Sequence, residues 1–341
     1  MLRCLELAKN GLGNVAPNPL VGCVIVHNDK IIGEGYHRQF GGTHAEVNAI
    51  NAVKDKSLLS ESEIYINLEP CSHYGKTPPC SDLIIDYGIK KVFIGSEDIS
   101  QEVSGKGIEK LIAAGHEVEN GLLNKEAISL NRRFYTYHKH HRPFIILKWA
   151  KTLDGYIDKI RDHQNEKAAQ ISNEISRSLV HKWRSEEDAI MIGTNTALYD
   201  NPQLNVRNWS GQNPLRIVLD KDLRLPGTLQ IFNDAQPTLV YTNQRQESTN
   251  DTEFATIKFN GELVQNITSD LYERNIQSVM IEGGKRLLDE FIKSNIWDEA
   301  RVLVGNKTFG NGIPAPEINL AAIFTEDIDD DKLLTYRNPQ S

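Results

Sequence analysis

The chain has 341 residues, of which 39% are hydrophobic and 25% are charged, and its formal net charge is -8. This length predicts two domains, because a typical domain holds about 150 residues. The acidic balance argues against a nucleic-acid partner, which usually needs a basic face, and no apolar run approaches the ~18 residues that cross a bilayer. We therefore expect a cytoplasmic enzyme whose four cysteines are reduced thiols or metal ligands.

Helices and strands alternate along the first part of the chain. Residues 21–26 (VGCVIV) form a continuous apolar run, which is typical of a strand buried on both faces. A turn over 27–30 leads into a hairpin partner over 31–37. The pattern also predicts strands over 63–70 and 90–95, and helices over 2–9, 44–53, 81–88, 107–115 and 122–137. We expect Ser81 to cap the helix that it begins, and Gly88 to end that helix.

A polar and basic stretch, His138–Pro143, marks the boundary between two halves. Beyond it the alternation restarts, with helices over 172–188 and 285–295 and strands over 143–150, 189–193, 214–220, 237–242, 278–284 and 299–305. Both halves are therefore predicted to be α/β, as domains 1–142 and 143–341. Residues 244–253 are polar and are expected to form an exposed loop. The histidines of the boundary have no cysteine or acid at ligand spacing, so we interpret them as part of a linker.

Two of the cysteines, Cys71 and Cys80, lie in one turn-rich segment, PCSHYGKTPPC. Upstream, His44 begins the helix HAEV, and Glu46 lies in its first turn. One imidazole and two thiolates supply the three protein ligands of a catalytic zinc, whose fourth position is left for water. Taken singly, a helix-capping histidine and two buried thiols would explain these residues. Together they match the zinc-deaminase signature, H-x-E followed by P-C and a second cysteine, although eight residues instead of two separate the cysteines.

This long-spaced form, together with APNPLVGCVIV, GEGYH and GGTHAEV, resembles the deaminase domain of the bifunctional deaminase/reductase family of riboflavin biosynthesis. The resemblance implies a cytidine-deaminase-like three-layer α/β/α fold with zinc on His44, Cys71 and Cys80. It also implies that Glu46 moves a proton from zinc-activated water to departing ammonia. The implied substrate is 2,5-diamino-6-ribosylamino-4(3H)-pyrimidinone 5′-phosphate, which loses its 2-amino group.

The same resemblance implies four substrate contacts in the deaminase half: Asn18, His73, Lys76 and Asp98. From the residues alone, His73 and Lys76 would lie in a solvated loop, and Asn18 would be a turn residue between two prolines. The family's D-P-N-P is replaced by DISQ at 98–101, so no contact after Asp98 is carried over. The other two cysteines, at positions 4 and 23, lie in a helix and a strand, where we expect them to be buried.

In the second half, a Gly-Gly turn joins the strand over 278–284 to a helix. Such a turn suits a phosphate, although it is more often only a turn. KWAKTLDG, GTNTALYDNPQLNVR, RIVLD and IEGG resemble, in this order, the reductase half of the same family. The resemblance implies a dihydrofolate-reductase-like α/β fold that uses NADPH to reduce the ribosyl group to ribityl. The implied NADPH contacts are Ala150, Thr196, Asp200, Gly283, Gly284, Lys285 and Arg286.

The implied substrate contacts of the reductase half are Lys148, Arg184, Leu204, Arg207 and Glu282. A guanidinium group matches the oxygen atoms of a phosphate, so the two arginines suit a sugar phosphate. Lys148 and Asp154 lie at the active-site strand, where a surface ion pair and a turn residue are the simpler interpretations. The proton donor of this half stays unassigned.

Segment 156–170 is longer than the family pattern and has Ala168 and Gln170 where serine and tryptophan would fit, so no contact is carried over there. A deaminase with a degenerate or nucleotide-binding second half is therefore the alternative to a bifunctional enzyme. A nucleic-acid-editing enzyme is disfavoured by the acidic balance and the inserted loop, and a structural zinc module would lack a fourth ligand. By resemblance we expect a homo-oligomer that acts on a small-molecule pyrimidine ribosyl phosphate, without a nucleic-acid or membrane partner.

Overall fold

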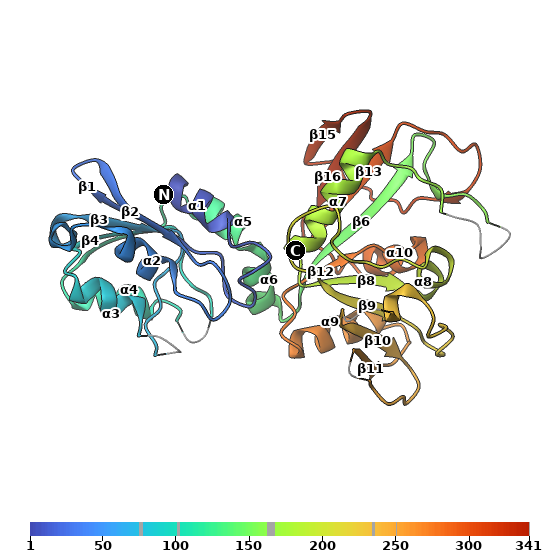
Figure 1. The fold of residues 1–341 in the computed structure, drawn as a ribbon, viewed down its shortest axis with the longest axis horizontal. Coiled ribbons are helices and arrows are strands. Elements are labelled where there is room, and N and C mark those ends of the chain that lie inside the picture. Colours follow the sequence, from blue (N-terminus) through green and yellow to red (C-terminus); the bar gives the residue numbers. More distant parts are fainter. Residues whose placement is uncertain (75–77, 101–102, 162–167, 234–235, 250, 341) are drawn as a thin grey trace. The chain divides into compact units, whose positions relative to one another are not determined.

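The structure, a computed structural model, describes residues 1–74, 78–100, 103–161, 168–233, 236–249 and 251–340 (Figure 1). The chain divides into two compact units, Met1–His141 and Arg142–Ser341. Among the helices in the described ranges, none has both the length and the apolar content that a membrane crossing requires. Each unit contains both helices and strands, so the α/β prediction is confirmed for both.

The first unit is built on a mixed sheet with the strand order β2-β1-β3-β4-β5. Strand β1 is antiparallel to both β2 and β3, whereas β3, β4 and β5 run parallel. Its elements are α1 (Leu2–Lys9), β1 (Gly22–His27), β2 (Lys30–Tyr36), α2 (Ala45–Ala52), the 3-10 helix η1 (Lys56–Glu61), β3 (Glu63–Ile66), α3 (Cys80–Asp86), β4 (Lys91–Ile94), α4 (Lys106–Ala113), β5 (Glu117–Asn120), α5 (Asn124–Leu130) and α6 (Arg132–His140).

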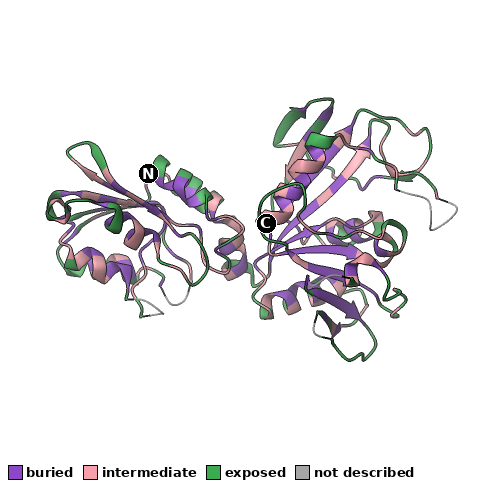
Figure 2. Cartoon of the chain, in the orientation of Figure 1, coloured by how far each residue is buried: buried purple, intermediate pink, exposed green. Residues whose placement is uncertain are grey.

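Successive residues of β1 face two different helical layers. Cys23 and Ile25 pack into the core that α2, α3 and α4 cover, whereas Val24 packs against Cys4 of α1. Helices therefore cover both faces of this sheet, as the three-layer prediction requires (Figure 1). Cys4 and Cys23 are both buried, as expected, and Figure 2 shows buried residues concentrated along the strands and the inner sides of the helices.

The hairpin between β1 and β2 turns at two residues with positive φ. Asn28 has a φ of 48° and Asp29 a φ of 59°. Two-residue hairpin turns need this left-handed backbone, which asparagine and aspartate tolerate better than most residues. The turn predicted over 27–30 is thus confirmed, with its outer residues ending β1 and beginning β2.

The single helix predicted over 122–137 is wrong, because the structure has α5 and α6 with a break at Asn131. The Asn131 carboxamide accepts a hydrogen bond from the Leu20 N–H at 2.7 Å and donates one to the Leu20 carbonyl at 2.9 Å. This buried contact with a distant segment holds Asn131 at a ψ of 22°, outside helical geometry. The strand predicted over 63–70 likewise ends at Ile66, because the Asn67 side chain bonds the backbone of residues 20 and 22.

Gly22 marks a very close approach of α1 to the sheet. A methyl group there would lie 2.1 Å from the Cys4 carbonyl oxygen and 2.9 Å from the Ala8 nitrogen. Gly22→Ala should therefore displace α1 and lower the free energy of unfolding of the first unit by about 3 kcal/mol, the upper end of the usual cost of overpacking. Urea unfolding followed by far-UV circular dichroism measures this change.

Tryptophan fluorescence provides an internal control for this variant, since all four tryptophans lie in the second unit, at positions 149, 183, 209 and 297. Their unfolding transition should not shift in Gly22→Ala. Gly261→Ala is the matched substitution, because nothing lies within 4 Å of the added methyl group. Circular dichroism transitions that coincide for the two variants would contradict the assigned packing of α1.

The second unit contains a sheet with the strand order β11-β10-β9-β8-β12-β6-β13-β16-β15. Neighbouring strands from β11 to β13 run parallel, and β16 and β15 extend the sheet in antiparallel pairing. Its elements are β6 (Phe144–Thr152), β7 (Tyr156–Asp158), α7 (Glu174–Glu186), β8 (Ala189–Gly193), α8 (Thr194–Asp200), β9 (Leu215–Leu219), η2 (Gln230–Phe232), β10 (Thr238–Thr242), β11 (Thr252–Thr256), α9 (Leu263–Glu273), β12 (Ser278–Ile281), α10 (Lys285–Lys293), β13 (Glu299–Gly305), β14 (Ile313–Pro314), β15 (Phe324–Ile328) and β16 (Asp331–Arg337).

Strand β6 is central to this unit because its side chains enter two cores in alternation. Ile145 and Leu147 pack on the side of α9 and α10, whereas Ile146 packs on the side of α7 and α8. Since β6, β8 and β12 are parallel neighbours, their carboxyl ends lie at one edge of the sheet. In open α/β sheets this is the edge at which ligands bind.

The exposed loop predicted over 244–253 is correct only in part. Residues 244–249 are exposed, but Thr252 is buried and begins β11, which pairs in parallel with β10. Only two residues of this strand, Phe254 and Ala255, are apolar, so its hydrophobic signal is short, and its pairing with β10 determines its structure.

Candidate active site

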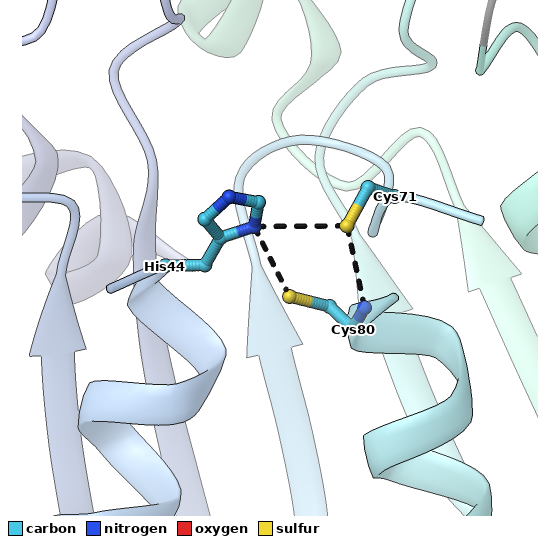
Figure 3. Close-up of side chains that lie close together, drawn as sticks. All are labelled: His44, Cys71 and Cys80. Carbon is cyan, nitrogen blue, oxygen red and sulfur yellow. Dashed lines mark hydrogen bonds between the residues drawn. The ribbon is translucent and has the colours of Figure 1, made fainter. Parts of the chain in front are cut away.

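The first candidate site joins the starts of two helices to the loop after β3. His44 is the N-cap of α2, Cys80 is the first residue of α3, and Cys71 lies between β3 and α3. Their ligand atoms all lie within 4.8 Å of one another. The Nδ1 atom of His44 is 3.6 Å from Cys71 Sγ and 3.3 Å from Cys80 Sγ (Figure 3).

Helix α3 begins one residue earlier than predicted, so Ser81 is not its N-cap. The N-cap is Pro79, and the Cys80 N–H donates a hydrogen bond to Cys71 Sγ at 3.3 Å (Figure 3). A sulfur atom from the preceding loop thus satisfies a backbone donor at the helix start. The positive end of the helix dipole favours a thiolate at this position.

The Cys71 thiol is the acidic member of the cluster. A hydrogen bond with the Cys80 thiol, aided by the His44 ring, lowers the pKa of Cys71 to about 4 even though burial opposes this shift. The same contact raises the pKa of Cys80, and the bond with Cys71 raises the pKa of His44 to about 9. Two sulfur atoms and one imidazole, with negative charge already favoured on one sulfur, form a donor set that fits zinc.

Glu46 lies in the first turn of α2 and is buried. Burial, followed by the negative charge on Cys71, raises the pKa of Glu46, and its carboxyl group is hydrogen-bonded to the Cys80 thiol. A carboxyl group beside the cluster whose pKa is raised holds a proton more readily than an ordinary glutamate, which suits a group that accepts a proton and then releases it.

Asn18 reaches this site through His37. The Asn18 Nδ2 atom is 3.0 Å from His37 Nε2, and His37 Nδ1 is 3.0 Å from the Thr43 carbonyl oxygen. Because a carbonyl only accepts, His37 donates from Nδ1 and accepts the Asn18 amide hydrogen at Nε2. The His37 ring lies 5.6 Å from the His44 ring, centre to centre, so Asn18 is held close to the cluster.

The other contacts expected in the deaminase half differ in their settings. Asp98 is buried, burial raises its pKa, and its carboxylate accepts the Ser100 N–H at 2.7 Å. His73 is exposed. Lys76 lies outside the described residues, as does the last residue of the DISQ segment.

A partly buried ion cluster forms the second candidate site, where β6, α7 and the end of β12 meet. Arg184 donates from Nε and Nη2 to the two carboxylate oxygens of Glu282, at 2.8 and 3.0 Å, and Lys148 Nζ lies 3.4 Å from the same carboxylate. Burial alone would raise the pKa of Glu282, but the positive charges of Arg184 and Lys148 outweigh it and lower the pKa to about 2. The carboxylate is therefore ionised, and the cluster keeps a net positive charge.

The same arginine holds the loop that contains the other expected substrate contacts. Arg184 Nη1 donates to the Asn205 carbonyl at 3.2 Å, and His181 contacts that carbonyl at 3.0 Å. Leu204 is buried and has a φ of 55°, which is unusual for leucine. Next to this loop lies an open pocket of about 540 Å³, lined by Arg207, Asn208, Trp209 and Ser210.

The Gly-Gly turn after β12 is tied to helix α8. The Gly284 N–H donates to Thr196 Oγ1 at 2.9 Å. A Cβ atom at Gly283 would lie 2.7 Å from the Leu287 side chain, so the turn is packed too closely for a larger residue without adjustment. Lys285 pairs with Asp289 within α10 at 2.9 Å.

Asp200 is engaged by the segment that departs from the family pattern. Arg161 donates to the Asp200 carboxylate at 2.5 Å and also pairs with Asp158 at 2.5 Å. The Arg161 guanidinium lies 5.6 Å from the centre of the Tyr199 ring. A ligand that uses the Asp200 carboxylate would therefore share it with Arg161 or displace this contact.

Comparison with known proteins assigns both halves. Residues 1–96 match the cytidine and deoxycytidylate deaminase zinc-binding region, and residues 143–322 match the RibD C-terminal domain. The riboflavin biosynthesis protein RibD of Aquifex aeolicus is 38% identical, with 95% of this chain and 90% of that protein covered. That of Actinobacillus pleuropneumoniae is 40% identical, with 98% and 94% covered. The chain belongs to the RibD family.

Solved structures agree with this family assignment. A diaminohydroxyphosphoribosylaminopyrimidine deaminase/5-amino-6-(5-phosphoribosylamino)uracil reductase from Thermotoga maritima is 39% identical, with a TM-score of 0.89 over 99% of this chain and 97% of that one. RibD of Acinetobacter baumannii is 31% identical, with a TM-score of 0.87 over 98% and 96%. The two-domain fold is that of the RibD family.

As a member of the RibD family, the chain is a bifunctional deaminase and reductase of riboflavin biosynthesis, with zinc and NADPH as its cofactors. The structure brings His44, Cys71, Cys80 and Glu46 into one cluster, as the motif spacing predicts. It also joins Lys148, Arg184 and Glu282 to one another, whereas the sequence interpretation treated each of them as a separate substrate contact.

Some of the expected RibD site residues stay predictions, and one neighbour of the site was missed. Ala150 lies on β6, two residues after Lys148, and Arg286 lies in the first turn of α10; their contacts with NADPH stay predictions. The sequence interpretation did not assign a role to His37. The sequence signal that includes His37 is the motif GEGYH, which resembles the family. The motif does not predict the hydrogen bond between His37 and Asn18.

Proposed function

We propose that the chain catalyses two successive steps of riboflavin biosynthesis. The domain of residues 1–142 removes the 2-amino group of 2,5-diamino-6-ribosylamino-4(3H)-pyrimidinone 5′-phosphate by hydrolysis. Residues 143–341 then use NADPH to reduce the ribosyl group, which gives 5-amino-6-ribitylamino-uracil 5′-phosphate. The convergence of His44, Cys71 and Cys80 beside a buried Glu46 carries the first assignment, and the likeness to the deaminase/reductase of Thermotoga maritima supports both.

In the deaminase step, His44, Cys71 and Cys80 would hold zinc, which would lower the pKa of a water toward neutrality. Glu46 accepts a proton from this water and passes it to the amino group that leaves as ammonia. Asn18, His73, Lys76 and Asp98 would orient the ring and the ribosyl phosphate. The bond from Asn18 to His37 supports this role, because it fixes which end of the carboxamide faces away from the histidine.

In the reductase step, NADPH supplies the reducing equivalent when it is bound. We assign Ala150, Thr196, Asp200 and residues 283–286 to the cofactor, since Thr196 and Gly284 already meet at the start of α10. Lys148, Arg184, Leu204, Arg207 and Glu282 would contact the substrate. The pocket beside Arg207 suits its phosphate, because a guanidinium group there can donate to two oxygens.

Product analysis of the purified, zinc-loaded chain tests this function. Incubation with the diaminopyrimidine ribosyl phosphate should exchange one amino group for oxygen without NADPH, and should add two further hydrogens when NADPH is present. Mass spectrometry distinguishes the two changes. Deamination without reduction would mean that the second half is a degenerate or nucleotide-binding domain. An unchanged substrate would show that the substrate assignment is wrong.

Removal of zinc should separate the two activities. Dialysis against a chelator is expected to abolish deamination, because the three ligands would then hold no cation that activates water. NADPH oxidation with the deaminated product should persist, since no residue of the zinc cluster lies in the second unit. Restored deamination after zinc addition is the control, and chelator-resistant deamination would contradict the zinc assignment.

We further propose that the protein acts in the cytoplasm as a homo-oligomer. Four free cysteines, two of them in the zinc cluster, fit a reducing compartment, and the family resemblance supports the assembly. Light scattering after size-exclusion chromatography measures the mass. A monomeric mass at micromolar concentration would overturn the assembly.

A further inference from the structure

Glu69 is a buried carboxylate that neither site uses. It lies two residues before Cys71, in the segment that leaves β3, and only 4% of its surface is exposed. Its backbone N–H donates to the Ser96 carbonyl at 2.9 Å. A carboxylate this deeply buried needs compensating donors, because an unpaired buried charge is costly.

Backbone donors from two segments supply that compensation. One carboxylate oxygen accepts the N–H groups of Gly107 and Ile108, at 2.8 and 3.2 Å, in the first turn of α4. The other accepts the N–H groups of Asp98 and Gly105, at 3.2 and 3.0 Å. These four bonds satisfy the carboxylate, and the start of α4 adds a favourable dipole.

The first turn of α4 also packs closely against Pro70, the residue that precedes Cys71. A Cβ atom at Gly107 would lie 2.1 Å from the Pro70 carbonyl oxygen. The backbone that leads into Cys71 is therefore packed against the same turn that Glu69 holds. The second carboxylate oxygen of Glu69 holds the backbone N–H of Asp98. Asp98 begins the segment that departs from the family's D-P-N-P.

We propose that Glu69 is a positioning residue of the deaminase, which fixes Cys71 for zinc and Asp98 for the substrate at the same time. This inference rests on the proposed function, since Cys71 and Asp98 carry the roles assigned there. Glu69 itself touches neither zinc nor substrate. It acts by tying the end of β3, the segment after β4 and helix α4 into one rigid unit.

Glu69→Gln tests the proposal, because it keeps the shape of the side chain but turns one acceptor oxygen into a donor that faces two N–H groups. In the full chain, zinc affinity and deaminase kcat/KM are each expected to fall about tenfold or more, as for other residues that orient a metal ligand. Competition with a chromogenic chelator measures zinc affinity without any turnover. Reductase kcat/KM should be unchanged because the reductase lies in the second unit, and the far-UV circular dichroism spectrum reports that the first unit has folded.

Glu63→Gln is the matched control, since Glu63 begins β3, the strand that leads to Glu69, and its side chain contacts Tyr65 and Lys91. If Glu69→Gln melts at a lower temperature but equals Glu63→Gln in zinc affinity and in deaminase kcat/KM, Glu69 is only structural and the proposal fails. A change in one of the two readouts alone also overturns it. Glu69→Asp, which keeps the charge on a shorter stem, replaces Glu69→Gln if the latter does not fold, and the same outcomes apply.

The proposed function can fail separately. A wild-type chain that does not deaminate the diaminopyrimidine would remove the substrate assignment, while the zinc affinities of the variants would still decide whether Glu69 positions Cys71.

Discussion

Glu46→Gln is expected to lower the rate of deamination by about 10²- to 10⁴-fold, the usual contribution of a general acid–base. Glutamine has nearly the shape of glutamate, so the buried site beside Cys80 can accept it. It cannot accept a proton from water or return one to the leaving amino group. The deaminase rate is measured as ammonia release from the diaminopyrimidine ribosyl phosphate by zinc-loaded protein.

Two measurements show whether this loss comes from proton transfer alone. Zinc content should equal that of the wild type, because Glu46 is not among the three clustered ligands. Reductase activity with the deaminated product should also be unchanged. A variant that binds zinc normally and deaminates within threefold of the wild-type rate would show that another group moves the proton.

The zinc cluster is predictable from the sequence because its signals are local. H-A-E at a helix start and P-C after a strand fix the types and directions of the side chains within a few residues. The pairing of β1 with both β2, which leads into α2, and β3, which leads to Cys71, places the two segments on one sheet. The resemblance then adds roles, but the donor set alone already indicates zinc.

What the sequence does not predict depends on contacts between distant residues. Asn131 ends a helix because its carboxamide bonds Leu20, and no property of residues 122–137 indicates this. In the same way, Arg184 and Glu282 are 98 positions apart in the chain, so their ion pair emerges only when α7 packs beside the end of β12. Strand β11 has only two apolar residues, Phe254 and Ala255, and needs its parallel pairing with β10 to form.

Glu282→Gln should damage the second unit in both stability and activity. The Glu282 carboxylate compensates the partly buried charges of Arg184 and Lys148. Its loss leaves two cations without their acid, and breaking a buried ion pair typically costs about 3–5 kcal/mol. Reductase kcat/KM is expected to fall at least about tenfold, since Arg184 also holds the loop with Leu204 through the Asn205 carbonyl.

Urea unfolding followed by tryptophan fluorescence measures the stability change, because the tryptophans all lie in the second unit. Glu290→Gln, an exposed position on α10, is the matched control and should stay within about 0.5 kcal/mol of the wild type. Deamination should be equal in all three proteins. A Glu282→Gln chain with wild-type stability would mean that the cluster does not compensate charge in solution.

The same carboxylate should make the second unit sensitive to acid. The pKa of Glu282 is lowered from its ordinary 4.5 to about 2 in the folded protein, because the attraction of Arg184 and Lys148 outweighs burial. The unfolded chain therefore takes up this proton first, so the stabilisation is complete above about pH 4.5 and is lost as the pH falls toward 2. Glutamine at position 282 does not titrate, so the difference in unfolding free energy between wild type and Glu282→Gln should shrink across this range. Other carboxylates titrate equally in both proteins, so their contributions cancel in that difference. A difference in unfolding free energy that stays constant with pH would place the ionised carboxylate outside the cluster.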